Sequence, residues 1–296
     1  EVIIEKEVIK EVVVEKEVVI EKEVTVYEAK PQMAEGAPAF MALGSYGGVV
    51  PMGSWCEGSR LDIHKSASMC DSSKNANVWN NLVVHNPEDP NEIVGELVKT
   101  WEMSDDLLTY SFQLVDNAYW WDGKPVTAHD VKYSIDRMGE NKTKGIPRGR
   151  VDMISNYVKE VEVIDDHSFK FHLQFPGASA LFPFLAVEYT KIYPKHVFEG
   201  IDLGSPERDF KEEEIVGSGS FKSVKWVRGS FQEFERVDNY WKSGMPFWDG
   251  YTVTPIREPQ RVIAAFRADQ VLMWNHAWPG LAIKDYIALS KELKDR

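Results

Sequence analysis

The fold is decided by residues 95–138, which read GELVKTWEMSDDLLTYSFQLVDNAYWWDGKPVTAHDVKYSIDRM. Residues 108–115 alternate roughly between apolar and polar and are rich in β-formers, which predicts a half-buried strand. Residues 121–125 are a cluster of turn residues. Thr127 and Asp130 predict a helix start, since the Thr127 hydroxyl can accept the N–H of Asp130 and the Asp130 carboxylate that of Thr127. One face of this helix carries Val131, Ile135 and Met138.

The same stretch carries a family resemblance. Several motifs, in this order, resemble the signature block of family 5 extracellular solute-binding proteins: Trp101-Glu102, Ser104-Asp105-Asp106, residues 108–112 and residues 122–131. These proteins are peptide- and oligopeptide-binding receptors of ATP-binding cassette importers. Leu107 departs from the pattern, because the family usually has glycine after the two aspartates. We therefore expect the turn to use Asp106 in a left-handed conformation or to change type.

Further matches extend the resemblance over residues 46–271; they are residues 47–50, 61–64, 193–197, 216–221, 238–241 and 259–268. Pro51 lacks a backbone N–H, so it suits an edge or the end of a strand. Pro259, at a first helical position, predicts a helix through Ala268. Other predicted elements are short helices within residues 66–82 and 181–188, a β pair over residues 152–161 and 163–174, and strands over residues 231–237 and 251–256.

The resemblance implies an α/β fold of the type II periplasmic-binding-protein kind, two-lobed with an inserted α+β domain. Family members continue through a further lobe, so we expect this chain to be truncated before most of the second lobe. The expected parts are a stalk and linker (1–45), a ligand-binding lobe I (46–85 plus 195–270), the inserted domain (86–194), and the hinge with the start of the second ligand-binding lobe (271–296).

Residues 1–28 form an imperfect ten-residue repeat of Glu, Lys, Val and Ile. Their β-branched residues disfavour a helix, while Glu and Lys favour one, so the local preference is split. We interpret the repeat as a low-complexity stalk, helical or extended, that does not pack on the main domain. Lipid-anchored binding proteins of bacteria carry similar tethers, so a lipid anchor is a hypothesis. A coiled-coil arm is the rival, but the repeat does not keep heptad positions.

Composition limits the function further. Hydrophobic residues make up 43% of the 296, which supports a sizeable core, and the net charge of −13 argues against nucleic-acid binding. The sequence contains no run of about 18 apolar residues, so it predicts no membrane span. Cys56 and Cys70 either pair, if the chain is secreted, or remain free thiols; zinc spacings are absent.

Enzymatic signatures are absent from the sequence. Residues 217–220 (GSGS) are not a Gly-x-Ser-x-Gly elbow and lack the Lys-Thr pair of a phosphate loop, so we interpret them as a tight turn. His167 and His172 fall on opposite faces of a strand and cannot share a metal ion. Glycosidase chemistry needs two facing carboxylates, and no pair is selected. We therefore predict a protein that is not an enzyme, with no catalytic residues, no cofactor and no metal.

Aromatic residues give the better indication of a ligand site. Trp274, Asn275, His276 and Trp278 follow the helix where family members cross into the other lobe, and they offer stacking faces and hydrogen-bonding groups. Alternatively they cap the hinge core. Trp55 and Glu57 form the second candidate group, with Glu57 meeting a ligand amine or remaining a solvated loop residue. The last candidates are the backbone N–H groups of Ser218 and Gly219, against a role in turn geometry alone.

The function implied by the resemblance is solute capture for an ATP-binding cassette importer, with peptides as the first ligand class. Oligosaccharides are the alternative, since sugar rings stack on indoles, and a secreted glycosidase or a structural arm are further readings. The implied partners are the small solute and the permease subunits, with no nucleic acid. We expect a periplasmic or extracellular monomer, tethered to the outer side of the cytoplasmic membrane. If the cleft needs both lobes, we expect this chain to bind its ligand weakly or not at all.

Overall fold

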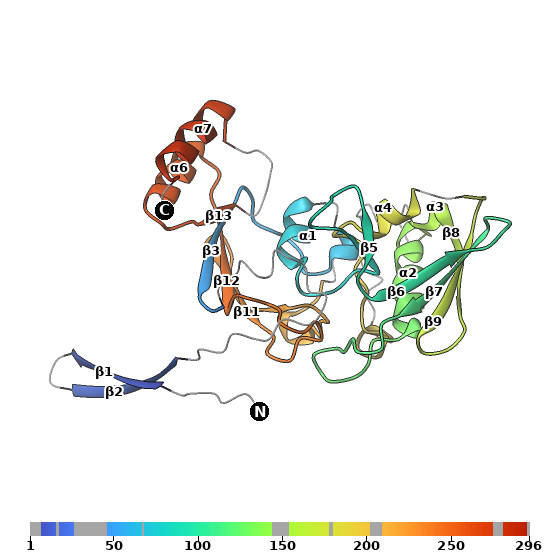
Figure 1. Ribbon diagram of the computed structural model, residues 1–296, viewed down its shortest axis with the longest axis horizontal. Coiled ribbons are helices and arrows are strands. Elements are labelled where there is room, and N and C mark those ends of the chain that lie inside the picture. Colours follow the sequence, from blue (N-terminus) through green and yellow to red (C-terminus); the bar gives the residue numbers. More distant parts are fainter. Residues whose placement is uncertain are drawn as a thin grey trace. The chain divides into compact units, whose positions relative to one another are not determined.

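The computed structural model describes two compact units, residues 1–46 and residues 47–296 (Figure 1). The described residues are 7–15, 18–26, 46–66, 68–143, 154–177, 180–201, 209–274 and 281–294. In the first unit, β1 (Glu7–Glu15) pairs antiparallel with β2 (Val18–Val26). Of the two conformations left open for the repeat, the structure therefore shows the extended one. Its Val and Ile content suits strands, where β-branched side chains keep their preferred rotamers.

A five-stranded mixed sheet forms one part of the second unit. Its order is β10 (Phe221–Val227), β11 (Phe231–Arg236), β12 (Gly250–Pro255), β3 (Val49–Ser54) and β13 (Met273–Trp274). β3 is parallel to both its neighbours, whereas β10, β11 and β12 are antiparallel in succession. The helix α6 (Pro259–Arg267) connects β12 to β13, as the parallel direction of the strands requires, and it begins at Pro259 as predicted.

Pro51 corrects the prediction of an edge or strand-end position. It lies inside β3, which has neighbours on both sides. Its carbonyl accepts the N–H of Leu272 at 2.8 Å, so its backbone polar groups face β13. The pairing with β13 begins one residue later, at Met52 opposite Met273. The missing N–H therefore costs no ladder hydrogen bond, and an inner strand tolerates the proline.

A four-stranded antiparallel sheet forms the other part. Its order is β6 (Val98–Met103), β7 (Thr109–Leu114), β9 (Ser168–Leu173) and β8 (Val158–Val163), which confirms the predicted strand 108–115. The predicted β pair is confirmed in its pairing, but its first arm was wrong over residues 154–157, which form a short helix before β8. Alternate residues of β7 and β9 point inward, and the Phe112 and Phe169 rings stack 4.9 Å apart. The helix α2 (Ala128–Thr143) packs along β8. Its predicted apolar face, which consists of Val131, Ile135 and Met138, is buried.

Shorter elements connect the two sheets. They are η2 (Ile63–Lys65), α1 (Met69–Asn75), β4 (Val83–His85), β5 (Ile93–Gly95), α3 (Ile154–Tyr157), α4 (Leu181–Leu185), α5 (Lys195–Phe198) and η4 (Glu212–Glu214). One hydrophobic core runs through both sheets, and its buried members include Trp79, Phe112 of β7 and Val253 of β12. Among the described residues, no helix has the length and apolar character needed to cross a membrane.

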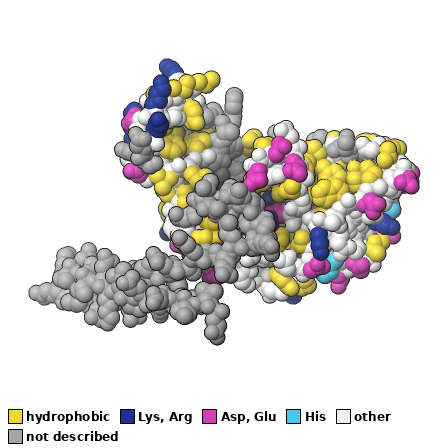
Figure 2. Space-filling model, viewed as in Figure 1, with side chains coloured by type: hydrophobic (Ala, Val, Ile, Leu, Met, Phe, Trp, Pro, Cys, Tyr) yellow, Lys and Arg dark blue, Asp and Glu magenta, His cyan; other side chains and the backbone are white. Residues whose placement is uncertain are grey.

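The last helix, α7 (Ile283–Glu292), lies beside α6 (Figure 1), and the two are joined by the ion pair of Arg267 with Glu292. Hydrophobic side chains show on the face of this region seen in Figure 2. On α7, Ile283 and Tyr286 are 79% and 63% exposed.

Leu107 corrects the prediction for the turn before β7. Leu107 itself takes the left-handed conformation, with φ of 60°. Asp106 instead uses its carboxylate, which accepts the N–H of Leu108 at 3.0 Å and the hydroxyl of Ser104 at 2.7 Å. The side chain of Asp106 thus fixes the turn, and the next residue takes the unfavourable dihedral angle that glycine would accept.

Candidate functional site: the carboxyl edge of the larger sheet

The carboxyl ends of four strands meet at one edge of the five-stranded sheet. β3, β12 and β13 run in the same direction, and so does β10, because it is antiparallel to β11 and β11 to β12. We call this edge, with the described residues that follow β3, β10 and β12, the carboxyl edge. In open α/β sheets, ligands bind in the crevice outside the carboxyl ends of the strands. This arrangement brings the residues after β3 and the last residue of β13, Trp274, to the same edge.

Trp55 and Trp274 lie on neighbouring strands at this edge. Trp55 follows β3 and is 37% exposed. Trp274 is opposite Gly53, and a Cβ atom on Gly53 would come within 2.4 Å of the indole ring. Gly53 therefore makes room for the Trp274 ring against the strand. Asn275, His276 and Trp278 lie outside the described residues, so their contact with a ligand stays a prediction.

Glu57 is held by the turn that ends β10. One carboxylate oxygen, Oε1, accepts the indole N–H of Trp226 at 3.2 Å and the backbone N–H of Gly229 at 2.8 Å. The side chain is half-buried and fixed rather than free in a solvated loop. A carboxylate has about four acceptor positions, so Glu57 retains capacity for a ligand donor.

Lys74 adds a buried positive charge near Glu57. Burial lowers the pKa of Lys74 to about 8, although attraction by the carboxylates of Glu57 and Asp71 acts in the opposite direction. Arg228 also lowers this pKa through repulsion between like charges. Charges of both signs therefore interact with one another around Glu57.

A disulfide ties the segment after β3 to α1. Cys56 and Cys70 are bonded, with their Cα atoms 5.9 Å apart, which resolves the two alternatives left open by the sequence. The bond closes a loop with a sequence separation of 14 residues, and such cross-links stabilise mainly by restricting the unfolded chain. Because Cys56 lies between Trp55 and Glu57, the disulfide also limits how far these two residues can move.

Two carboxylates hold the backbone that follows Glu57. Asp71 accepts the N–H groups of Ser59 and Arg60, the latter at 3.1 Å. Asp209 accepts the N–H groups of Leu61 at 2.9 Å and Asp62 at 2.7 Å. The segment from Ser59 to Asp62 thus keeps one conformation through charge-assisted hydrogen bonds rather than through a regular element.

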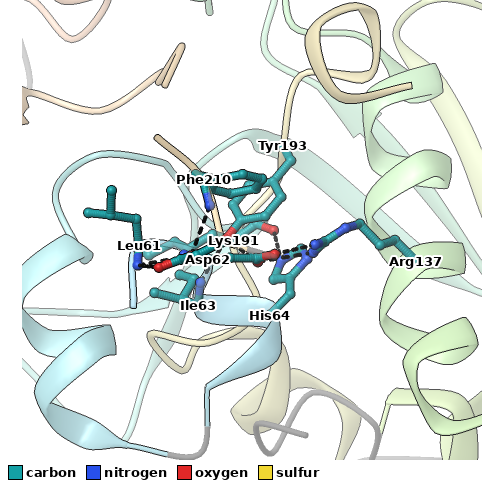
Figure 3. A network of polar contacts seen from close by, with 9 residues as sticks. Leu61, Asp62, Ile63, His64, Arg137, Lys191, Tyr193 and Phe210 are labelled. Carbon is teal, nitrogen blue, oxygen red and sulfur yellow. Dashed lines mark hydrogen bonds and ion pairs between the residues drawn. The ribbon is translucent and has the colours of Figure 1, made fainter. Parts of the chain in front are cut away.

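A buried polar network then joins this segment to α2 (Figure 3). Asp62 forms a bidentate ion pair with Arg137, and both side chains are buried. The hydroxyl of Tyr193 accepts the N–H of Ile63 at 3.1 Å. The His64 ring stacks on Tyr193, with centroids 3.9 Å apart. Sequence reasoning noted Asp62 and His64 only as a family match, because no local signal points to a partner on a helix so far along the chain.

His64 is neutral in this network. Its Nε2 lies 2.8 Å from the carbonyl of Lys191, so Nε2 carries the proton and donates. Burial, together with the nearby Arg137 guanidinium, lowers the pKa of His64 to about 3. The neutral His64 ring, with its tautomer fixed, therefore supports the neighbouring segment and does not accept a proton at ordinary pH.

Ser218 and Gly219 pack against the segment before β4. A Cβ atom on Gly219 would come within 2.0 Å of the Asn77 carbonyl oxygen, which explains the glycine by close backbone approach. The Gly219 N–H donates to the carbonyl of Val78 at 2.9 Å. The Ser218 hydroxyl is buried and accepts the N–H of Asn80 at 3.1 Å. These contacts give both residues a packing role, and their contact with a ligand stays a prediction.

Comparison with known proteins identifies the family. The family described as "Bacterial extracellular solute-binding proteins, family 5 Middle" matches residues 92–292. The chain belongs to this family. The match covers β5 to α7, and so includes the turn that holds Glu57, the Ser218–Gly219 segment and Trp274.

Relatives of this family 5 protein include the periplasmic oligopeptide-binding protein of Salmonella typhimurium. It is 26% identical over 247 residues, which are 79% of this chain and 43% of that protein. The solved oligopeptide-binding protein of Bacillus subtilis, in complex with a nonapeptide, has a TM-score of 0.72 and 21% identity over 84% of this chain and 47% of that one. A periplasmic binding protein of Helicobacter pylori, in complex with a peptide, has a TM-score of 0.70 and 22% identity over 86% and 50%.

These structures show the fold of the family 5 protein. It is the mixed α/β fold of periplasmic binding proteins, as the sequence predicted. The chain spans between two fifths and half of the length of these three relatives. Within the described residues, no group of three or more His, Cys, Asp or Glu side chains could hold a metal ion.

The signature block of the family 5 protein begins α2 with a cap that differs in one bond from the prediction. The Asp130 carboxylate accepts the N–H of Thr127 at 2.8 Å, as expected. The Thr127 hydroxyl donates to the same carboxylate at 3.0 Å instead of accepting the N–H of Asp130. Asp130 also accepts the N–H of Lys195 at 2.8 Å. The carboxylate of Asp130 thus accepts hydrogen bonds from the start of α2 and from the start of α5, so its role is structural.

Proposed function

We propose that this family 5 protein captures a peptide outside the cytoplasm and delivers it to an ATP-binding cassette importer. The observation that carries the proposal is the carboxyl edge, where the exposed Trp55 and the fixed carboxylate of Glu57 are separated by only one residue, Cys56. The relatives named above support it, since those of Salmonella typhimurium and Bacillus subtilis are oligopeptide-binding proteins and the solved structures from Bacillus subtilis and Helicobacter pylori are complexes with peptides. No bond is made or broken in the ligand, so the protein is a receptor and not an enzyme.

Glu57 is the proposed partner of a ligand amine. Its Oε1 is occupied by Trp226 and Gly229, so the remaining acceptor capacity is oriented before the ligand arrives. A carboxylate held in this way loses little side-chain entropy on binding an ammonium group. Trp55 supplies a ring face beside it, and Trp274 with Asn275, His276 and Trp278 completes the proposed site.

The proposal extends to organisation and location. Lobe I comprises residues 46–85 and 195–270, residues 86–194 form the inserted domain, and the ligand is gripped by closure of two lobes. The partners are the permease subunits of the importer, and the protein is a monomer. The resemblance and the periplasmic relatives support a periplasmic or extracellular place, with residues 1–45 as a tether to a lipid anchor.

Calorimetry with the full 296-residue chain tests the peptide proposal. The probes are trialanine and N-acetyl-trialanine, which differ in the free amine that Glu57 would bind. We expect trialanine to bind at least tenfold more tightly, and Glu57→Gln to remove that preference while Glu102→Gln, a control on exposed β6, leaves it unchanged. Equal binding of the two peptides, or hydrolysis of either during the titration, would overturn the proposal.

An oligosaccharide is the second candidate ligand, favoured by the exposed indole of Trp55. Sugar rings stack on indole faces without needing a free amine. Titration with maltotriose under the same conditions separates the two ligand classes. Binding of maltotriose, lost in Trp55→Ala and kept in Glu57→Gln, would favour the oligosaccharide over the peptide.

A further inference from the structure

Arg228 is a second fixed charge at the carboxyl edge. It follows β10 and its guanidinium carbon lies 3.3 Å from the centroid of the Trp226 ring, so the planar group stacks on the indole. Nη1 donates to the carbonyls of Gly58 at 3.3 Å and Ser59 at 3.4 Å. The ring on one side and the two carbonyls at one corner hold the guanidinium in a single orientation.

Only Nη1 of Arg228 donates to acceptors among the described residues. Within the same ranges, Nε and Nη2 make no hydrogen bond and the guanidinium forms no ion pair with a carboxylate. Glu57 is close in the fold, but its Oε1 is directed at Trp226 and Gly229. Arg228 is therefore an exposed cation that forms no ion pair with the part of the chain that the structure describes, and the net charge of the whole chain is −13.

We propose that Arg228 is a specificity residue that binds a carboxylate of the ligand, next to the ligand amine held by Glu57. This inference rests on the proposed function and narrows it to peptides with an acidic side chain close to the amino end. Arg228 and Glu57 are anchored by the same turn, so the site offers one fixed cation beside one fixed anion. A ligand with an ammonium group and a nearby carboxylate matches both charges.

The stacked geometry makes Arg228 suited to this role. A guanidinium presents parallel N–H groups that match the two oxygens of a carboxylate. Stacking on Trp226 removes most of the rotamer freedom that an exposed arginine would lose on binding. An amide of the same size offers only one oxygen and no charge, so the site would discriminate aspartate from asparagine at this ligand position.

The test compares two tripeptides that differ in this group alone. Calorimetry with the full chain measures alanyl-aspartyl-alanine against alanyl-asparaginyl-alanine. We expect the wild-type protein to prefer the aspartyl peptide about tenfold or more, the fold-change typical of a charge-assisted contact. Arg228→Gln should abolish the preference and Arg228→Lys should keep part of it. Lys225→Gln, which removes another cation of the same hairpin, is the matched control and should leave the preference unchanged.

The ratio of the two affinities separates specificity from structural support. If Arg228 only held the 55–59 segment in place, Arg228→Gln would weaken both peptides equally and the ratio would survive, which would overturn the inference. Equal binding of the two peptides by the wild-type protein would overturn it as well, while leaving peptide capture intact. Hydrolysis of either tripeptide, or binding of maltotriose but of no peptide, would overturn the proposed function and the inference with it.

Discussion

At the scale of single residues, Leu107 shows how the chain departs from its family. Its φ of 60° costs a residue with a side chain roughly 1–2 kcal/mol. Glycine would avoid this steric cost, but it would lose more chain entropy on folding, which cancels part of the gain. Leu107→Gly should therefore raise the free energy of unfolding by about 1 kcal/mol, measured by urea denaturation. Leu107→Ala keeps the strain and removes only the half-exposed side chain, so it should give no gain. A loss of stability in the glycine variant would contradict this account.

His64 gives a prediction for pH. Its folded pKa of about 3 lies below the unfolded value of 6.5, so the unfolded chain binds the extra proton between those values. The contribution of neutral His64 to the free energy of unfolding is complete above pH 6.5 and decreases as the pH drops toward 3. The wild-type free energy of unfolding should fall by about 2 kcal/mol from this group between pH 7.5 and 5.0.

The measurement is urea unfolding at the two pH values, in the wild-type protein and in His64→Gln. The glutamine cannot take up a proton, so the variant should be less stable at pH 7.5 but should lose about 2 kcal/mol less on acidification. Equal losses in the two proteins would show that His64 does not contribute to the acid response.

At the scale of elements, two glycines mark places where one backbone segment lies in close contact with another. A Cβ on Gly219 would meet the Asn77 carbonyl oxygen at 2.0 Å, and one on Gly217 would meet the Val78 oxygen at 2.1 Å. Gly219→Ala must push apart the segment before β10 and the segment before β4, so we expect a loss of about 3 kcal/mol or more. Gly139→Ala in α2 is the control, since its Cβ finds only ordinary contacts, and it should gain about 0.5–1 kcal/mol. Thermal unfolding of the two variants checks the contrast.

Elements were predictable where their signal was local. The strand at 108–115, the cap of α2 and the Pro259 start depend on neighbouring residues, and the structure confirms them apart from one hydrogen bond of the cap. The pairing of β1 with β2 is not predictable from sequence, because the composition of the repeat favours helix and strand alike. Pairing of β3 with β13 joins residues far apart in the sequence, and no local pattern fixes that register.

The residues of the candidate site also divide into those that the sequence predicts and those that only the three-dimensional structure reveals. Trp55 and Glu57 were predicted through the family resemblance, which carries information about distant neighbours. Arg228 was missed, because an arginine in a hairpin turn is ordinary in sequence and its stacking on Trp226 appears only in three dimensions. The Cys56–Cys70 bond was left open for the same reason, since spacing alone does not bring two sulfur atoms together.

At the scale of the whole molecule, the ion pair of Asp62 and Arg137 connects the segment behind the carboxyl edge to the helix of the smaller sheet (Figure 3). Both groups are buried, so removing one leaves the other charged and unpaired. Asp62→Leu and Arg137→Met should each cost about 3–5 kcal/mol, and the double variant should lose much less than the sum. The exposed pair of Lys99 and Asp116 is the control, and its removal should change little.

The same double-mutant cycle decides whether the two sheets unfold as one unit. One hydrophobic core runs through both, and the buried pair adds a charged contact between them, so the wild-type protein should unfold in a single transition by tryptophan fluorescence and by circular dichroism. The single variants weaken that contact while the core remains, so they should lower the midpoint and keep the two probes coincident. If the probes separate in Asp62→Leu but coincide in the double variant, an unpaired buried charge, and not the lost contact, uncouples the sheets. Separate transitions already in the wild-type protein would contradict the picture of one shared core.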